Sequence, residues 1–394
     1  VLYYFHCLER DKGITNKLIY SGGKPTMQAP LEGIRILDLS RLLPGPYCTM
    51  FLADLGAEVV KVEDPVGGDY VRWTPPYIGK SGAMYLALNR NKKSITLNLK
   101  EERGREILLR LIEDYDVLVE GFRPGVLDRL GVGYEKARAI NPRIVYCALT
   151  GYGQEGPYSN RAGHDINYIG YTGVLSLNGP RNGRPVPPGV QVGDLNGAMG
   201  AVVGIMSALL ERERSGEGQF VDVSLAAGAF SMLPLVVGRI EAGDDPQRAG
   251  ETRLTGGMAA YNTFETSDGK YVCLGAIEPK FFAKFCRLVD REDLEVLHMG
   301  TGRDREKLEA ELEALFKTKT RREWCGLLED EDICFGPVNF PEEALDDPHV
   351  KEWGMITETP LPDGGSMRQV SLPFKLSRST RGRSEERRVG KECT

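Results

Sequence analysis

Two short segments carry side chains whose types and spacing suit acid–base chemistry. Gly163–Tyr168 has the sequence GHDINY and Val192–Gly197 has the sequence VGDLNG, and each precedes a run of apolar and small residues. These runs predict helices, which places His164, Asp165 and Asp194 at or near helix starts. A helix start offers free backbone N–H groups that bind an anionic oxygen. The two segments therefore indicate a site that moves protons and stabilises negative charge.

A third segment, Gly275–Pro279 (GAIEP), follows the strand-like sequence YVCLGAI. A carboxylate at the end of a strand, here Glu278, can orient an imidazole and favour its charged form. Taken singly, each residue also fits a structural role. Glu278 suits the surface before a helix that begins at Pro279, Asp194 suits a helix N-cap, and His164 suits a structural histidine.

The composition excludes several classes of protein. The chain has 394 residues, 41% of them hydrophobic and 27% charged, which suits a globular protein with two domains. A net charge of −6 argues against nucleic acid as the main partner, so a polyanionic ligand needs a local basic patch. We expect no transmembrane helix, because no apolar run reaches ~18 residues without a charge. The N-terminus lacks the apolar core of a signal peptide.

The eight cysteines are scattered, with no C-x-x-C pair and no histidine at ligand spacing. This pattern indicates neither a zinc site nor a disulfide framework. We therefore expect reduced, buried thiols in a cytoplasmic protein without a metal site.

The N-terminal part of the chain predicts an α/β fold. A strand at 33–39, a helix opening near Pro46 and a strand at 57–63 form a βαβ start. The intervening turn, SRLLPGP, is not the G-x-G-x-x-G of dinucleotide-binding proteins, and the acid at the end of the second strand is weak evidence for a ribose. We predict a Rossmann-like large domain without a dinucleotide site.

Basic residues recur at the predicted strand ends and helix starts of this domain, where open α/β sheets bind phosphates. They are Arg90, Lys92, Lys93, Lys100, Arg123 and Arg129. Composition alone equally allows a solvated basic rim. The preceding Gly- and Pro-rich loop, with Arg72 and Trp73, suits an active site or a dimer contact.

The predicted domain boundaries follow changes in composition. A large domain at 29–226 is followed by a polar, breaker-rich linker at 227–260, and a strand and one long apolar helix lead away from the large domain. A smaller α+β domain at 261–345 starts with a hairpin and continues with helices at 279–290, 303–317 and 320–330. Residues 346–380 return to the large domain. We interpret 1–28 as an extension or a non-native segment, and 381–394, which is charge-rich and lacks an apolar period, as an artefactual tail.

GHDINY, VGDLNG and GAIEP, in this order and spacing, resemble the signature of the α-methylacyl-CoA racemases of the family III (CaiB/BaiF) CoA-transferase superfamily. The resemblance covers residues 29–378. It implies that five residues contact CoA: Leu97, Leu99, Lys100, Arg123 and Arg129. One departure is Asp64, which stands where these racemases often carry an Arg that holds the adenosine end.

The resemblance also implies an architecture. In this superfamily the chain leaves the large domain and returns to it by two long connectors, so that each subunit is a ring and two rings interlock. We therefore expect a homodimer in which each site combines the large domain of one subunit with the small domain of the other. Glu278 then reaches His164 across the interface.

The reaction implied is racemisation of 2-methylacyl-CoA thioesters at C2 by two-base proton transfer through an enolate. His164, poised by Glu278, and Asp194 serve the two faces of the enolate, and the backbone N–H of Asp165 holds its oxygen. This chemistry needs no metal or redox cofactor, because CoA is part of the substrate.

Two other functions stay open. In the transferases of the superfamily the residue matching Asp165 is a nucleophile that forms acyl and CoA-thioester intermediates, so the alternative is transfer of CoA between carboxylic acids. A non-catalytic acyl-CoA-binding protein keeps the basic cradle but not the acid–base groups, and the presence of His164, Asp194 and Glu278 argues against it. The sequence does not specify the acyl chain.

Overall fold

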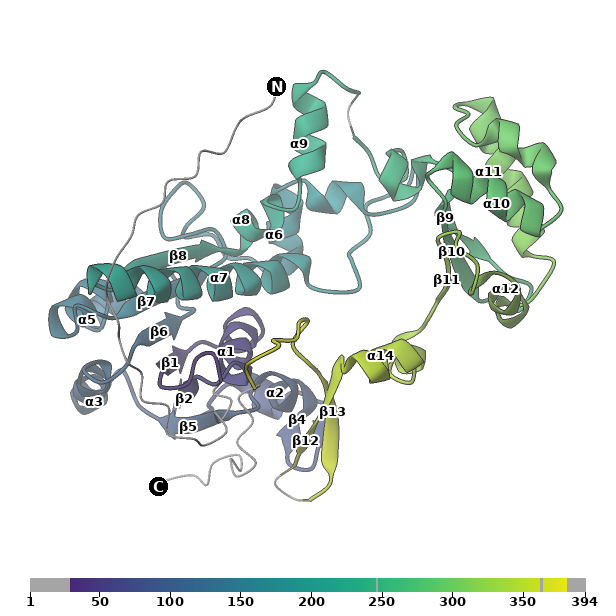
Figure 1. Cartoon of the computed structure of the whole chain (residues 1–394). Helices are drawn as coiled ribbons and strands as arrows, with labels where there is room; N and C mark the ends of the chain where they lie inside the picture. The colour runs from purple at the N-terminus through teal and green to yellow at the C-terminus, as the bar shows by residue number, and fades with distance from the viewer. Residues whose placement is uncertain (1–28, 246, 362–363, 381–394) are drawn as a thin grey trace, which may run out of the picture.

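The structure is a computed structural model that describes residues 29–245, 247–361 and 364–380. The two predicted terminal segments, 1–28 and 381–394, lie outside the described residues. Figure 1 shows a large domain and a smaller one, joined by two separate stretches of chain. This arrangement confirms an α/β fold with a Rossmann-like large domain and a smaller α+β domain.

A six-stranded parallel sheet forms the centre of the large domain, in the order β5-β2-β1-β6-β7-β8. Ile36 in the central strand pairs with Val59 on one side and Val117 on the other. The strands are β1 (Arg35–Leu39), β2 (Glu58–Glu63), β5 (Lys92–Thr96), β6 (Val117–Glu120), β7 (Val145–Thr150) and β8 (Phe220–Ser224). Most buried residues of the central strands are apolar on both faces, as expected for a parallel sheet covered on both sides, with Asp38 of β1 and Lys61 of β2 among the exceptions.

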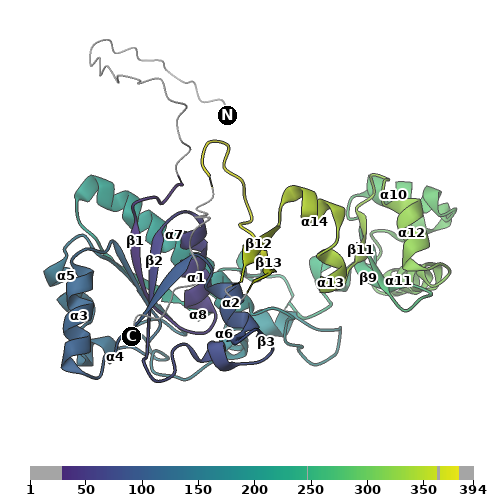
Figure 2. The same ribbon diagram turned by 90° about the horizontal axis from the view of Figure 1, so that it is seen from below.

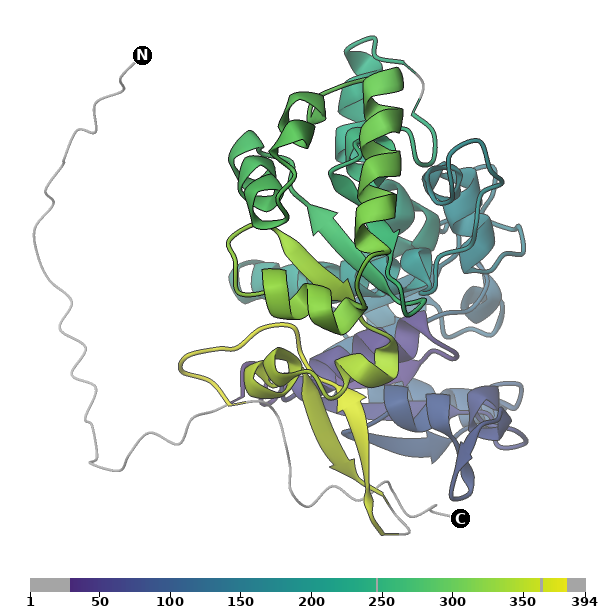
Figure 3. The ribbon, with the colours of Figure 1, turned by 90° about the vertical axis from the view of Figure 1, so that its right-hand side faces the viewer.

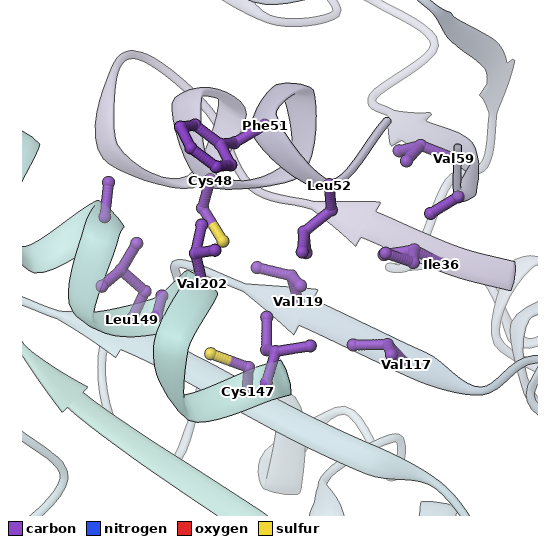
Figure 4. Packing of buried hydrophobic residues seen from close by; sticks show 14 of the residues in the cluster. Ile36, Cys48, Phe51, Leu52, Val59, Val117, Val119, Cys147, Leu149 and Val202 are labelled. Carbon is purple, nitrogen blue, oxygen red and sulfur yellow. The ribbon is translucent and has the colours of Figure 1, made fainter. Parts of the chain in front are cut away.

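Helices α1 (Pro44–Asp54) and α7 (Val192–Ser215) pack on one face of this sheet. Figure 4 shows Cys48 and Leu52 of α1, Val202 of α7 and Val119 of β6 meeting in this core. The opposite face is covered by α3 (Glu102–Ile112) and α5 (Tyr134–Ile140), whose apolar residues meet Leu37, Leu118 and Tyr146. Strand residues alternate between the two cores because successive side chains point to opposite faces.

The small residues of α7 let it approach its neighbours closely. A Cβ on Gly228 would lie 2.9 Å from the backbone of Gly197, so α7 and α8 (Leu225–Phe230) touch through glycines. Length and a mean hydropathy of 1.4 alone would allow α7 to cross a membrane. The same composition suits a core helix, and α7 packs here against α1, α8, β7 and β8.

The stretch leading to the small domain is broken rather than one long helix. The sequence predicts a single apolar helix after β8, but the chain forms α8 and then α9 (Pro234–Glu241). Pro234 occupies the start of α9, where its missing N–H is tolerated, whereas inside a longer helix it would remove a hydrogen bond. The expectation of one long helix was therefore wrong.

The small domain is built on an antiparallel sheet in the order β11-β10-β9. Its strands are β9 (Tyr261–Glu265), β10 (Tyr271–Gly275) and β11 (Phe335–Val338), and its main helices are α10 (Pro279–Leu288), α11 (Arg303–Phe316) and α12 (Arg321–Leu328). The predicted hairpin is confirmed, because β9 and β10 pair around the turn that contains Gly269. Phe264, Phe316 and Trp324 fill a separate core.

The chain returns through α14 (Pro348–Trp353) and the hairpin of β12 (Ile356–Pro360) and β13 (Ser366–Val370). Figures 2 and 3 show this yellow hairpin beside the large domain, away from the green small domain. A buried contact holds it there: Arg90 Nη1 donates to Gln369 Oε1 at 2.9 Å, and Arg90 also pairs with Asp54. The two domains are thus joined by two connectors with separate attachments.

Short elements complete the described chain. They are η1 (Tyr70–Trp73), β3 (Tyr77–Ile78), β4 (Ser81–Gly82), α2 (Ala83–Leu88), α4 (Val126–Arg129), α6 (Asp165–Tyr171), η2 (Val174–Leu177), η3 (Arg253–Gly257), η4 (Glu292–Leu297) and α13 (Pro341–Ala344). Two of these helices follow strands of the central sheet along the chain: α4 comes after β6, and α6 comes after β7.

Candidate active site

The histidine motif forms the start of α6, as predicted. His164 is the N-cap residue, and its backbone N–H donates to Asn167 Oδ1 at 3.0 Å, while the N–H of Asn167 donates to the His164 carbonyl at 2.8 Å. These two bonds fix the backbone on either side of Asp165, the first helical residue. The His164 side chain is exposed, so it is open to a substrate.

The carboxylate of Asp165 joins the start of α6 to the start of α7. Its Oδ1 accepts hydrogen bonds from the backbone N–H of Gly193 at 2.7 Å and of Asp194 at 3.0 Å. Those groups lie in the first turn of a 24-residue helix, where free N–H groups favour an anion. Position 193 suits glycine, because a Cβ there would lie 3.2 Å from this oxygen. His164, Asp165 and Asp194 are therefore brought together, as predicted.

Asp194 is the residue of this group with a strongly changed acidity. Burial raises the pKa of its carboxyl, the negative charge of Asp165 raises it further, and His164 partly offsets the rise, so that the pKa lies at about 6. A carboxyl with such a pKa exchanges protons near neutral pH, as a general acid–base group must.

Tyr168 contacts the backbone of the histidine motif at Gly163. Its hydroxyl donates to the Gly163 carbonyl at 2.6 Å, and a Cβ on Gly163 or Gly151 would come within 2.7 Å of its ring. Burial raises the pKa of Tyr168 to about 12, with Asp194 adding to the rise and Arg123 opposing it. The sequence predicts no role for Tyr168, because its contact with Gly151 forms only in the folded chain.

A cavity of about 420 Å³ lies at the carboxyl edge of β1, β2, β5 and β6. Four of the five residues predicted to contact CoA line it: Leu97, Leu99, Lys100 and Arg129. Arg41 and Phe122 also line it, and sequence analysis missed both. Arg41 follows the end of β1, so the signal was the same strand-end position that identified the other basic residues. The cavity combines these cations with apolar walls, which suits a phosphorylated ligand, and the acidic residues Glu63, Asp64 and Asp69 also line it.

Arg123, the fifth predicted CoA contact, lines a neighbouring cavity of about 150 Å³ together with Glu120, Tyr146 and Gln154. Its electrostatic effect on Tyr168 places it toward α6. Arg123 therefore does not line the larger cavity with the other four.

The prediction of phosphate-binding roles for Arg90 and Lys92 was wrong. Lys92 is the first residue of β5, so both residues lie at the opposite edge of the sheet from the cavity. Both are buried, and Lys92 Nζ lies 3.1 Å from Asp38 Oδ2, while Arg90 contacts Asp54. Both residues therefore use their charges in buried ion pairs within the protein. Lys93 pairs with Glu58 at the surface.

The acid at the end of β2 is unavailable for a ribose. Glu63 Oε1 accepts from Arg72 Nη2 at 2.6 Å and from Ser94 Oγ at 2.5 Å, and Oε2 accepts from the Asp69 N–H at 2.9 Å. Arg72, predicted to face a substrate or a partner subunit, thus holds a buried carboxylate. The carboxylate of Glu63 is therefore engaged in contacts within the protein.

Within the single chain, Glu278 does not lie with the other predicted acid–base residues, His164, Asp165 and Asp194. It is exposed, and it is the N-cap residue of α10 in the small domain. Within the described ranges its side chain forms no hydrogen bond or ion pair, and it has no contact with His164.

Metal-ligand geometry and thiols add little to this site. The described part of the chain contains no group of three or more His, Cys, Asp or Glu side chains placed to hold a metal ion. Cys48, Cys147 and Cys286 are buried free thiols, whereas Cys334 is exposed, so the expectation of buried thiols was wrong for Cys334. Cys7 and Cys393 lie outside the described residues.

Comparison with known proteins agrees with these observations. The sequence model of CoA-transferase family III matches residues 31–388. Succinyl-CoA:glutarate CoA-transferase of Homo sapiens is 37% identical over 366 residues, which cover 91% of this chain and 82% of that protein. Alpha-methylacyl-CoA racemase of Mus musculus is 37% identical over 323 residues, which cover 82% of this chain and 81% of that protein.

A solved structure extends the likeness to the fold. The crystal structure of a CAIB/BAIF family protein from Brucella suis matches with a TM-score of 0.81 and 33% identity, covering 93% of this chain and 97% of that one. The resemblance found in the three motifs is confirmed, and the chain belongs to CoA-transferase family III.

Proposed function

We propose that this enzyme racemises 2-methylacyl-CoA thioesters at C2. The observation that carries the proposal is the convergence of two acid–base side chains, His164 and Asp194, at the helix starts joined by Asp165. Inversion at a carbon requires a proton acceptor on one face and a proton donor on the other. A pKa of about 6 at Asp194 suits a group that alternates between these roles.

In this mechanism one of the two groups removes the C2 proton, and the electron pair moves toward the thioester carbonyl to form an enolate. The other group then returns a proton to the opposite face. The α-proton of a thioester is weakly acidic, so the developing oxyanion needs a fixed donor. The backbone N–H of Asp165 suits this role, because no acceptor among the described residues bonds to it.

The cavity suits the CoA part of such a substrate. Lys100, Arg129 and Arg41 supply cations in a chain of net charge −6, and Leu97 and Leu99 supply an apolar wall. Binding energy from this remote handle positions C2 at the acid–base residues. CoA is part of the substrate, and the proposed reaction requires no redox or metal cofactor.

We further propose a homodimer in which the partner subunit supplies the glutamate. Glu278 is exposed and unpaired within the described chain, so its carboxylate is free to meet the imidazole of another copy. Such a contact would favour the protonated imidazole during turnover. Molecular mass in solution tests the dimer, and loss of activity in Glu278→Gln tests the contact.

CoA transfer between carboxylic acids is the second candidate. It is favoured by the 37% identity with a succinyl-CoA:glutarate CoA-transferase and by the presence of Asp165, which would attack the thioester carbonyl as a nucleophile. Against it, one oxygen of Asp165 already accepts two backbone hydrogen bonds.

Deuterium exchange separates the two functions. In deuterated water a racemase incorporates deuterium at C2 starting from either enantiomer of 2-methylacyl-CoA, and nuclear magnetic resonance measures it. A transferase leaves C2 unlabelled and forms an acyl-enzyme that hydroxylamine traps. Finding that adduct without C2 exchange would overturn the racemase proposal.

Asp165→Asn provides an independent test. Asparagine keeps an oxygen that can accept both backbone hydrogen bonds, but it removes the nucleophile and the negative charge beside Asp194. A racemase should retain C2 exchange, and the acidic limb of its pH profile should move below pH 6, because Asp165 contributes to the raised pKa of Asp194. A transferase should lose its activity.

A further inference from the structure

The turn that presents Glu278 is held by a histidine from a later part of the chain. His298 follows η4, and its Nε2 lies 2.8 Å from the carbonyl oxygen of Ala276. A carbonyl oxygen only accepts, so Nε2 carries the proton and donates it. His298 is 6% exposed and Ala276 is fully buried, so water cannot readily replace this bond.

The same imidazole also fixes the helix that follows Glu278. Its ring lies parallel to the ring of Phe282, with centroids 4.4 Å apart and an angle of 8° between the planes. Phe282 belongs to the first turn of α10, and the N–H groups of Phe281 and Phe282 donate to the Glu278 carbonyl at 3.0 and 3.3 Å. His298 therefore holds the chain both two residues before Glu278 and four residues after it.

The turn itself is tight. The N–H of Ile277 donates to the Gly275 carbonyl at 2.9 Å, and the N–H of Gly275 donates to the Cys334 carbonyl at 2.8 Å. The backbone around Glu278 is thus fixed from several sides, whereas its carboxylate projects into solvent. Stacking alone would be served equally by a phenylalanine at 298, so the donor is the feature that requires histidine.

We propose that His298 is a positioning residue for Glu278, which it serves by holding the Ala276 carbonyl and the Phe282 ring so that the β10–α10 turn presents the carboxylate in one direction. This inference rests on the proposed function, because it assumes that Glu278 acts on the imidazole of His164. Burial lowers the pKa of His298, which keeps the ring neutral and its single N–H directed at Ala276.

His298→Phe tests the donor, because phenylalanine keeps an aromatic ring against Phe282. We expect kcat for C2 exchange to fall about ten- to a hundredfold with KM for acyl-CoA unchanged, as for a displaced catalytic group. His298→Gln restores a side-chain N–H and should recover most of kcat. His349→Gln, the same change at an exposed histidine of α14, is the matched control and should behave like the unmodified protein.

A double variant identifies the residue through which His298 acts. If His298 works through Glu278, then adding His298→Phe to Glu278→Gln should cause no further loss of kcat. Multiplied losses, or a normal kcat in His298→Phe, would overturn the inference. Should His298→Phe fail to fold, the same cycle is run with His298→Gln, whose smaller loss must likewise vanish in the Glu278→Gln background.

Failure of the proposed function can be distinguished from failure of the inference about His298. Normal kcat in Glu278→Gln, or no C2 exchange in the unmodified protein, rejects the role of Glu278 rather than the structural action of His298. Hydrogen exchange then decides about His298, since His298→Phe should speed exchange of the Phe281 and Phe282 amides. Unchanged exchange at these amides would show that His298 does not hold the turn.

Discussion

The pKa values of buried carboxyl groups shift in opposite directions in the two halves of the central sheet. Around β1, β2 and β5, burial alone would raise the pKa of each carboxyl, but nearby cations reverse the effect. Lys61 and Lys92 hold the pKa of Asp38 well below its usual range, and Arg72 is the main cause that brings the pKa of Glu63 to about 2. These carboxylates stay ionised and serve as fixed partners in the fold.

Toward β6, β7 and α7, the buried carboxyl groups of Glu120 and Asp194 lack such partners. Neither Glu120 nor Asp194 forms an ion pair within the described chain, and burial raises their pKa values to about 7 and about 6. The difference teaches that ion pairing, more than depth, decides whether a buried carboxyl in this protein is an anchor or an acid–base group. Of these two unpaired carboxyls, Asp194 belongs to the proposed site, whereas Glu120 lines the smaller cavity.

The largest expected effect is on catalysis at an unpaired carboxyl. Asp194→Asn removes one of the two proposed proton-transfer groups, so under the proposed function racemisation should slow by about 10²–10⁴-fold. The melting temperature and the KM for acyl-CoA should change little, because Asp194 donates only its backbone N–H to Asp165. Chiral analysis of the product measures the rate, and racemisation at the normal rate would contradict the proposed role.

A substitution around β1, β2 and β5, where the buried carboxylates are paired with cations, should lower stability instead of activity. Asp38→Asn leaves Lys92 buried without its anion, whereas Lys61 keeps its ion pair with Asp69, and removing one partner of a buried pair typically costs about 3–5 kcal/mol of unfolding free energy. Urea unfolding measures this change, and the protein that stays folded should keep its kcat. Asp346→Asn, at an exposed carboxylate paired with Lys351, is the matched control and should leave the midpoint unchanged. Equal stability of both variants would contradict the comparison.

The free energy of unfolding contributed by buried carboxyls of the two halves should also depend on pH with opposite signs. Because the folded-state pKa of Glu120 is raised from 4.5 to about 7, the native state binds the extra proton, and stability falls as pH rises through this window, by roughly 3 kcal/mol. Glu63, lowered to about 2, contributes stability that is lost as pH falls from 4.5 toward 2. Urea unfolding at several pH values measures both trends.

Glu120→Gln should remove the first trend. The difference in unfolding free energy between the variant and the unmodified protein then isolates Glu120 from all other titrating groups. Glu135→Gln, at an exposed position of α5, is the control and should keep the full pH dependence. A parallel pH dependence in Glu120→Gln and the unmodified protein would show that Glu120 titrates normally.

The smallest expected effect concerns substrate binding. Arg129→Ala should raise the KM for acyl-CoA about tenfold with a smaller change in kcat, as for the loss of an interaction present throughout the reaction. Arg123→Ala should raise KM less, because Arg123 lines the neighbouring cavity. Arg138→Ala, an exposed position on α5, serves as the control. An unchanged KM in Arg129→Ala would place CoA elsewhere.

Much of the fold follows from local patterns. The βαβ start, the hairpin of the small domain and its three main helices were all predicted from apolar periodicity and turn residues, within a few residues of their observed bounds. The break between α8 and α9 was missed although Pro234 marks it. The misassigned Arg90 and Lys92 show a further limit, because strand-end position was judged without knowing at which residue β5 begins.

What the sequence alone determined was which residues are candidates for acid–base chemistry and the kind of element that presents them. Capping residues and apolar runs are local, so they place His164, Asp165 and Asp194 at helix starts without any knowledge of the fold. Only the tertiary structure decided that Asp165 bonds to the start of α7, 28 residues farther along the chain, and that burial raises the pKa of Asp194. Hydrogen bonds between distant segments and desolvation depend on how helices pack on the sheet, and no local spacing encodes them.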